Sequence, residues 1–142
     1  MTQMKSQKLK CPKCGHLQET VVWTSLDVSL DPNLREKLFN GEINIFVCQE
    51  CGNRALVNVG LLYHDMHREY CVWYYPVQAM EDPEFFKTFT KDGKLNIDGL
   101  PIAMEKIGHY FKEPHIVFDI NEMIQYITFR DKLYDLHKEL IS

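Results

Sequence analysis

Two cysteine pairs with the same spacing constrain this chain more than any other feature. The first pair is Cys11 and Cys14 in CPKCG, and the second is Cys48 and Cys51 in CQECG. A tight turn, here called a knuckle, directs both sulfurs of a pair at one point. The glycine that follows lets the chain leave the turn with a positive φ. Two knuckles supply four thiolates, the closed tetrahedral ligand set of a structural zinc ion. We therefore predict one zinc ion bound by these four cysteines.

The same four thiolates allow two other readings. A single iron ion also accepts four thiolates, and a C-x-x-C pair can serve as a redox dithiol. Redox pairs normally occur once, at the start of a helix, and neither pair here precedes a helical pattern. The 33 residues between the pairs exceed the usual spacing of about 15–20. Loop closure, however, costs only about 0.6 kcal/mol per doubling of length. Zinc is the predicted metal and iron the alternative, and a closed site offers no position for a substrate.

Composition and cysteine usage indicate a cytoplasmic protein. The chain has 142 residues and no apolar run near the roughly 20 residues of a membrane span. Its first ten residues are polar and basic, so we expect neither a secretory signal nor a membrane segment. Five cysteines, an odd number, argue against a disulfide framework. The fifth, Cys71, lies in an apolar run and is expected to be a buried, unreactive thiol.

The charge of the chain is unevenly distributed. The net charge is −4, and four lysines without an acid precede His16, so the remainder carries −8. An acidic body is a poor binder of nucleic acid, because such affinity comes largely from neutralising phosphates. Lys8, Lys10 and Lys13 are expected to offset the negative charge of the four sulfurs nearby. A surface for nucleic acid or for an acidic partner is the alternative reading of these lysines.

The first half of the chain is predicted to be rich in β-structure. β-branched and aromatic residues favour strands at residues 17–28, 43–47, 55–63 and 69–77, with residues 64–68 as a turn. A short helix is expected over residues 31–40, with Asp31 as its cap and Pro32 in its first position. This helix accounts for the long gap between the two knuckles.

The second half changes to helical patterns. Asp82 and Pro83 open a helix, and residues 101–111 are helix-like. Residues 115–119 form a short strand or an extended lead-in to the strongest predicted helix, residues 120–140. An apolar stripe along that helix is expected to be core, and a partner-binding face is the alternative.

The predicted fold class is α+β, in one domain of residues 1–142. A zinc-ribbon-like antiparallel β part with a helical insert is expected over residues 8–78, and a mostly helical part over residues 79–142. Both faces of the aromatic strand near residues 70–77 are apolar, so that strand should be covered on both sides. A stacking platform for single-stranded nucleic acid would also need interleaved basic residues, and only Arg68 is close.

The ordered set of motifs resembles the CpXC domain family. The matching stretches are CPKCG (11–15), VWTS (22–25), LFNGEIN (38–44), CQECG (48–52) and LLYHD (61–65). The resemblance covers roughly residues 8–130. It departs at Gln49, where the second knuckle of the family usually has proline, and all four cysteines remain in place. The family occurs in bacteria and archaea. It implies a zinc-binding domain and brings no reaction and no partner.

A second polar cluster contains His64, Asp65 and His67. The H-x-x-H spacing could bring two imidazoles together, with Asp65 orienting one, as an acid–base pair or a second metal site. A polar turn with solvated histidines is the plainer interpretation. These three residues are the weak catalytic candidates.

Taken together, the sequence favours a non-enzymatic zinc protein that serves as an interaction or adaptor module, with a protein partner or a second copy of itself. A nucleic-acid-binding zinc ribbon and an enzyme using the second polar cluster are the alternatives.

Overall fold

A mixed five-stranded sheet forms the centre of the computed structural model, which describes residues 2–94 and 115–141. Its strands lie in the order β1 (Gln3–Lys10), β2 (Leu17–Asp27), β5 (Leu61–Asp65), β6 (Tyr70–Tyr74) and β7 (His115–Val117). β1–β2 and β5–β6 are antiparallel, whereas β2–β5 and β6–β7 are parallel. The antiparallel pairing predicted for residues 8–78 is therefore found in β1–β2 and β5–β6 but not in β2–β5. A parallel β2–β5 pair needs a long crossover connection, and the helical insert and second knuckle provide it.

A separate two-stranded sheet carries the second knuckle. It pairs β3 (Ile45–Val47) with β4 (Arg54–Leu56) in antiparallel register. The predicted strand over residues 55–63 is thus two strands, β4 and the start of β5. Sequence patterns missed β1, whose residues are almost all exposed. Its formation depends on pairing with β2 rather than on an apolar face of its own.

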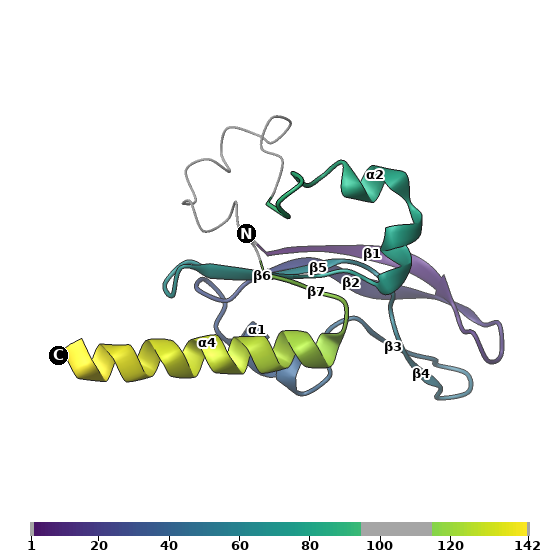
Figure 1. Cartoon of the computed structure of the whole chain (residues 1–142). Coiled ribbons are helices and arrows are strands. Elements are labelled where there is room, and N and C mark those ends of the chain that lie inside the picture. Colours follow the sequence, from purple (N-terminus) through teal and green to yellow (C-terminus); the bar gives the residue numbers. More distant parts are fainter. Residues whose placement is uncertain (1, 95–114, 142) are drawn as a thin grey trace.

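Helices cover the two faces of the large sheet (Figure 1). On one face lie α1 (Asn33–Phe39) and the long helix α4 (Ile120–Ile141), and on the other lie the 3₁₀ helix η1 (Val77–Glu81) and α2 (Pro83–Phe86). The C-terminal part of α4 extends past the strands. The protein is therefore α+β, mostly sheet in its N-terminal half and with a helix at its C-terminus.

The helix boundaries follow local capping chemistry. Asp82 accepts a hydrogen bond from the backbone of Glu84 at 3.0 Å at the start of α2, and Asp119 accepts one from Asn121 at 2.7 Å at the start of α4. α1 differs from the prediction, because Pro32 occupies its N-cap position and no side chain caps it. The predicted helix over residues 101–111 lies outside the described residues.

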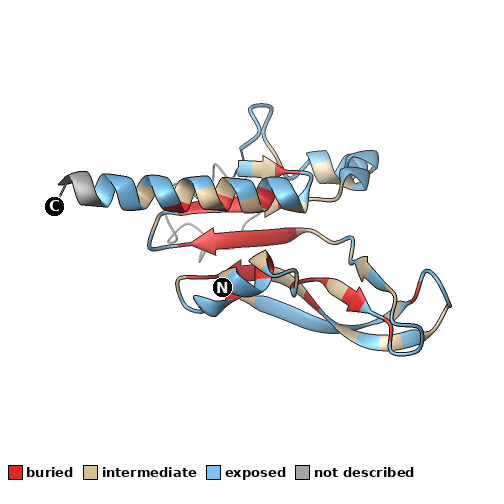
Figure 2. Ribbon diagram, turned by 90° about the horizontal axis from the view of Figure 1, so that it is seen from below, coloured by how far each residue is buried: buried red, intermediate tan, exposed pale blue. Residues whose placement is uncertain are grey.

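The main core lies between the sheet and the helices α1 and α4. Figure 2 shows the buried residues concentrated in the strands behind α4, while β1 and the outer side of α4 are largely exposed. Met123 and Ile127 of α4 are fully buried, as the apolar stripe predicted. Further along, Asp131 is the buried residue, and Leu133 and Leu136 are exposed. The stripe therefore changes from core to surface partway along the helix.

The strand β6 is covered on both faces, as predicted. Val72 and Tyr74 belong to the core under α4, whereas Cys71 and Trp73 pack with Leu62 on the opposite face. Among the described residues, no helix combines the length and apolar character needed to cross a bilayer.

Candidate metal centre

Each knuckle is the loop of a β-hairpin. The first connects β1 to β2, which pair up to Lys10 and Leu17, and the second connects β3 to β4. The two loops repeat the same hydrogen bonds. The N–H of the first cysteine donates to a carbonyl five residues later, at 2.8 and 2.9 Å, and each glycine N–H donates back to the first cysteine's carbonyl at 2.9 Å. The repetition gives two equivalent turns that face each other.

Both glycines adopt the backbone conformation that the motif predicted. Gly15 has φ +80° and Gly52 has φ +75°. A side chain in this left-handed region costs roughly 1–2 kcal/mol, which glycine avoids. The strict glycine after each pair is therefore explained by the turn itself.

The four sulfurs lie together as a metal centre requires. The sulfurs of Cys11, Cys14, Cys48 and Cys51 are all within 4.8 Å of one another. The Cys11–Cys51 distance is 3.7 Å, and the Cys14–Cys48 distance is 3.5 Å. Four sulfurs bound tetrahedrally at about 2.3 Å from an ion lie about 3.8 Å apart. The cluster therefore fits one metal ion with no further ligand.

Backbone amides stabilise the negative charge of the sulfurs. The N–H groups of Lys13 and Cys14 lie 3.4 and 3.5 Å from the Cys11 sulfur, and the Cys51 N–H lies 3.5 Å from the Cys48 sulfur. The Cys14 amide lowers the pKa of Cys11 to about 6, and the Cys51 amide lowers the pKa of Cys48. Metal binding needs deprotonated thiols, so these amides favour the ligating form.

The centre is half-shielded from solvent. Cys11 and Cys48 are buried with Phe46, and the other two cysteines are exposed. The side chain of Lys10 reaches over the first knuckle, with its Cε 3.5 Å from where a Cβ on Gly15 would stand. The charge-offsetting role of the lysines stays a prediction.

Sequence reasoning missed two amide side chains that tie the second hairpin to β2. Asn44 is buried with φ +56°, and its amide bonds both the N–H and the carbonyl of Trp23, at 2.7 and 2.8 Å. Gln18 makes a similar pair of bonds beside Cys48. Neither residue has a distinctive sequence signal, apart from the tolerance of asparagine for positive φ.

The second polar cluster does not form one site. His64 and Asp65 are neighbours on β5, so their side chains point to opposite faces of the sheet. His64 lies beside Asp27 of β2, Asp65 bonds Arg68, and the exposed His67 contacts Tyr134. His64 is only 1% exposed, so its interpretation as a solvated turn residue was wrong. Burial lowers the pKa of His64.

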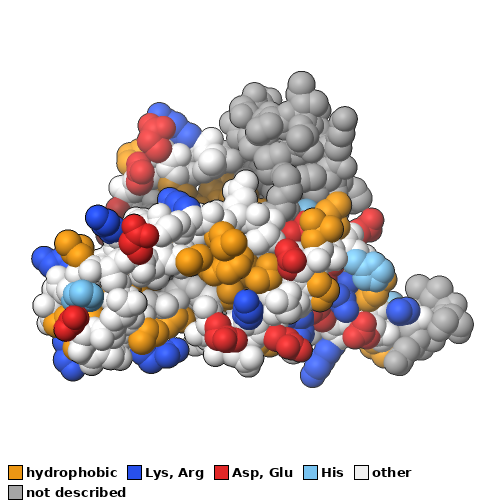
Figure 3. Space-filling model, turned by 180° about the vertical axis from the view of Figure 1, so that it is seen from behind, with side chains coloured by type: hydrophobic (Ala, Val, Ile, Leu, Met, Phe, Trp, Pro, Cys, Tyr) orange, Lys and Arg blue, Asp and Glu red, His pale blue; other side chains and the backbone are white. Residues whose placement is uncertain are grey.

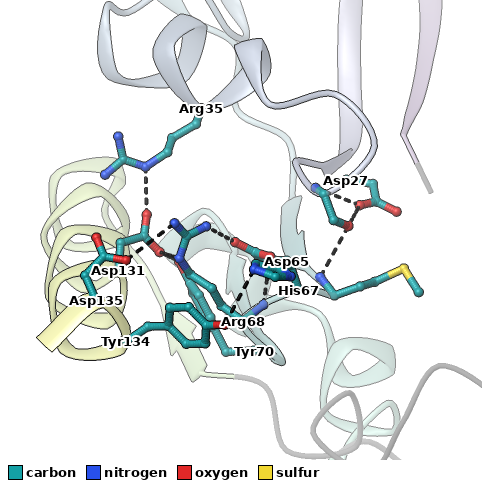
Figure 4. A network of polar contacts seen from close by, with 11 residues as sticks. Asp27, Arg35, Asp65, His67, Arg68, Tyr70, Asp131, Tyr134 and Asp135 are labelled. Atoms are coloured by element: carbon teal, nitrogen blue, oxygen red, sulfur yellow. Dashed lines mark hydrogen bonds and ion pairs between the residues drawn. The ribbon is translucent and has the colours of Figure 1, made fainter. Parts of the chain in front are cut away.

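Asp65 instead belongs to a network of polar groups between the sheet and α4 (Figure 4). Arg68 bonds Asp65 at 3.0 Å and lies 3.6 Å from Asp131 of α4. Asp131 also accepts hydrogen bonds from the Tyr70 hydroxyl and from Nε of Arg35, both at 2.7 Å. The network joins α1, β5, β6 and α4. It compensates two buried carboxylates, and no substrate is needed to explain it.

Fold and site together define a mixed α+β protein with a four-cysteine centre that can hold one metal ion. The family model described as CpXC protein matches residues 9–141, and the chain belongs to the CpXC family. The match includes α4, beyond the extent seen from the motifs. No curated protein and no solved structure matches the chain.

Proposed function

We propose that the cysteine centre holds one zinc ion with a structural role. The support is the closed set of four sulfurs at tetrahedral spacing, which leaves no open position for water or substrate. The ion would join the β1–β2 hairpin to the β3–β4 hairpin, which is otherwise supported by a small apolar cluster and by the amides of Gln18 and Asn44. In this role zinc stabilises the fold and takes no part in a reaction.

Elemental analysis of protein purified without chelator tests the metal. One zinc per chain, lost together with order in the β3–β4 hairpin on chelation, is the expected result. One iron per chain with thiolate-to-iron absorption would replace zinc by iron. No stoichiometric metal of any kind would overturn the proposal.

We also propose that the protein is a non-enzymatic interaction module and that the exposed side of α4 contacts its partner. Phe129, Leu133 and Leu136 have helical i, i+4 and i+7 spacing, so they lie on one side of α4. Their exposed fractions are 57%, 37% and 52%. A row of apolar side chains on a helix that extends past the sheet is typical of a docking surface.

The charges around this row indicate the chemistry of the partner. Lys132 is exposed beside the row. The guanidinium of Arg130 instead lies over the Tyr70 ring and bonds the Tyr126 hydroxyl. Asp131 and Asp135 face the arginine network on the other side of the helix. The docking side is therefore apolar, with the exposed Lys132 beside it. This surface suits a protein segment with apolar and acidic side chains. It suits the same surface of a second copy less well, because the charges beside the row would be alike in both copies.

Nucleic-acid binding has less support. Figure 3 shows Lys and Arg interspersed with Asp and Glu over one face of the molecule, without a continuous basic patch. On β1 the lysine at position 8 pairs across the hairpin with Glu19. An acid on the neighbouring strand weakens the attraction of β1 for phosphates.

An enzymatic role also has less support. The described residues form an open hollow of about 500 Å³ lined largely by phenylalanines. Its polar lining includes Thr90 and Lys91, and His64, Asp65 and His67 do not line it. The weak catalytic candidates therefore do not line this hollow.

Photo-crosslinking in a bacterium or archaeon that carries this chain tests the interaction role in its proposed cytoplasmic setting. A photoreactive residue replaces Leu136 on the docking side or, as a control, Leu30, which is 70% exposed and lies between β2 and α1. We expect a defined adduct from position 136 alone, at a partner segment rich in acidic and apolar residues. Lys132→Glu should weaken it several-fold, and the matched charge change Lys5→Glu on β1 should not.

Four results would overturn the interaction proposal. Equal adducts from both positions would mean random contact, adducts with a second copy would mean self-association, and adducts with RNA or DNA would favour the nucleic-acid alternative. Absence of any adduct at position 136 would remove the docking role of α4.

A further inference from the structure

The two knuckles are held to the rest of the protein in different ways. The first belongs to the β1–β2 hairpin, whose eight register pairs anchor it in the large sheet. The second belongs to the β3–β4 hairpin, which has three pairs and forms its own sheet. A four-ligand centre needs both knuckles at a fixed separation before the ion arrives, otherwise metal binding must also order the second hairpin.

A single side chain bridges the hairpins at the metal centre. The Nε2 group of Gln18 donates to the carbonyl of Val47 at 2.9 Å, and its Oε1 accepts from the N–H of Gln49 at 2.8 Å. These two backbone groups stand immediately before and after Cys48. The glutamine thus holds the chain on both sides of one ligand, using the donor and acceptor that a neighbouring strand would use.

β2 and β3 belong to different sheets, so hydrogen bonds from side chains must hold them together. Asn44 makes the corresponding pair of bonds with the backbone of Trp23 at the opposite end of β3. Two side-chain amides therefore stand where strand pairing would otherwise hold β3 to β2. Asn44 lies at the far end of β3 from the knuckle, so Gln18 is the amide that bears directly on the ligand.

We propose that Gln18 is a positioning residue for the metal centre, holding Cys48 and Cys51 at the distance from the first knuckle that the ion requires. This inference rests on the proposed zinc binding. Outer groups that orient metal ligands typically contribute 10–100-fold to metal affinity. Loss of the Gln18 amide should weaken zinc binding by about that factor, because the second knuckle would then be ordered by the ion alone.

Competition titration of the full chain with a chromophoric zinc chelator tests the proposal. Gln18→Ala removes both bonds. Gln18→Glu keeps the length and the acceptor and sets a carboxylate oxygen against the Val47 carbonyl. Both should raise the zinc dissociation constant about 10–100-fold, while Gln18→Asn should retain part of the affinity. Gln7→Ala, an exposed glutamine on the adjacent β1, is the matched control and should bind like wild type.

Two further measurements separate positioning from a general loss of stability. Cobalt at saturation should give the same tetrahedral thiolate spectrum in Gln18→Glu as in wild type, reached at higher cobalt concentration. Urea unfolding of the metal-free proteins should show similar midpoints. Unchanged zinc affinity in Gln18→Ala and Gln18→Glu, or an affinity loss fully matched by a lower metal-free midpoint, would overturn the role of Gln18. A wild type that binds no zinc would instead overturn the proposed metal.

Discussion

Replacing Asp131 with alanine should be one of the most destabilising single changes on α4. The carboxylate is 5% exposed and accepts hydrogen bonds from Tyr70 and Arg35, both at 2.7 Å. A hydrogen bond to a buried charged group contributes about 1.5–3 kcal/mol. Arg35 is about one-third exposed, so its ion pair adds about 1 kcal/mol or less. The expected loss is about 3 kcal/mol, at the lower end of the roughly 3–5 kcal/mol for breaking a buried pair.

The loss has two physical components. The Tyr70 hydroxyl is buried and would be left without its acceptor, and Arg68 would retain only Asp65 and the distant Asp135 as counter-charges. Tyr70→Phe removes the hydroxyl while leaving Asp131 paired with the arginines, so it should cost less, about 1 kcal/mol. The double variant should show a coupling of about 1 kcal/mol or more, because the two residues share one bond.

Urea unfolding with zinc in excess, followed by far-ultraviolet circular dichroism, measures these values. Asp135→Ala is the matched control, one helical turn along, with a side chain 63% exposed and 3.9 Å from Arg68. It should change the free energy of unfolding by less than about 0.5 kcal/mol. If Asp131→Ala and Asp135→Ala gave equal, small changes, the network would not anchor α4 and the reasoning would be refuted.

Three other changes test the centre and the sheet. Cys48→Ser should release the metal and unfold at least the β3–β4 hairpin, seen as loss of zinc by elemental analysis and of hairpin amide signals by NMR; a retained stoichiometric ion would contradict a four-sulfur site. Gly52→Ala should lower stability by about 1 kcal/mol in urea unfolding because φ is +75°, and Gly52→Asn should cost less. Apart from its chain neighbours, no described atom lies within 4 Å of a Cβ at this position, so equal losses would contradict the backbone argument. Burial lowers the pKa of His64, so the unfolded chain binds more protons below its ordinary pKa of about 6.5 and stability should fall as pH drops from about 6.5 towards the lowered value. His64→Gln should reduce this dependence of stability on pH in zinc-saturated protein. An unchanged dependence would mean that another titratable group causes it.

The cysteine centre could be predicted because its chemistry is local. The spacing of each pair, the glycine after it and the four-sulfur total need no knowledge of the rest of the fold. The structure brings these four residues together and gives both glycines the expected positive φ. The positions of α1, α2 and α4 were also foreseeable, since proline, capping residues and apolar spacing act within a few residues of one another.

The prediction for the second polar cluster failed because it overlooked the strand pairing of His64 and Asp65. His64 and Asp65 were assigned to a turn because polar residues and a histidine pair follow an apolar run. Their backbone is instead paired with β2 and β6. Arg68, three residues further along, bonds Asp65, and the distant partner is Asp131 on α4, which lies 3.6 Å from the same arginine. No local pattern reports a partner that lies on another element.

The sequence by itself therefore determined the four-cysteine site and the α+β class, since ligand chemistry, turns and helical periodicity are short-range properties of the chain. The tertiary structure decided the mixed strand order, the burial of His64 and Asp65, and the change of α4 from core to surface after Ile127. It also decided that Gln18 and Asn44 hold the second hairpin against β2. These features depend on which strands become neighbours, and that choice follows from packing the whole chain around one core.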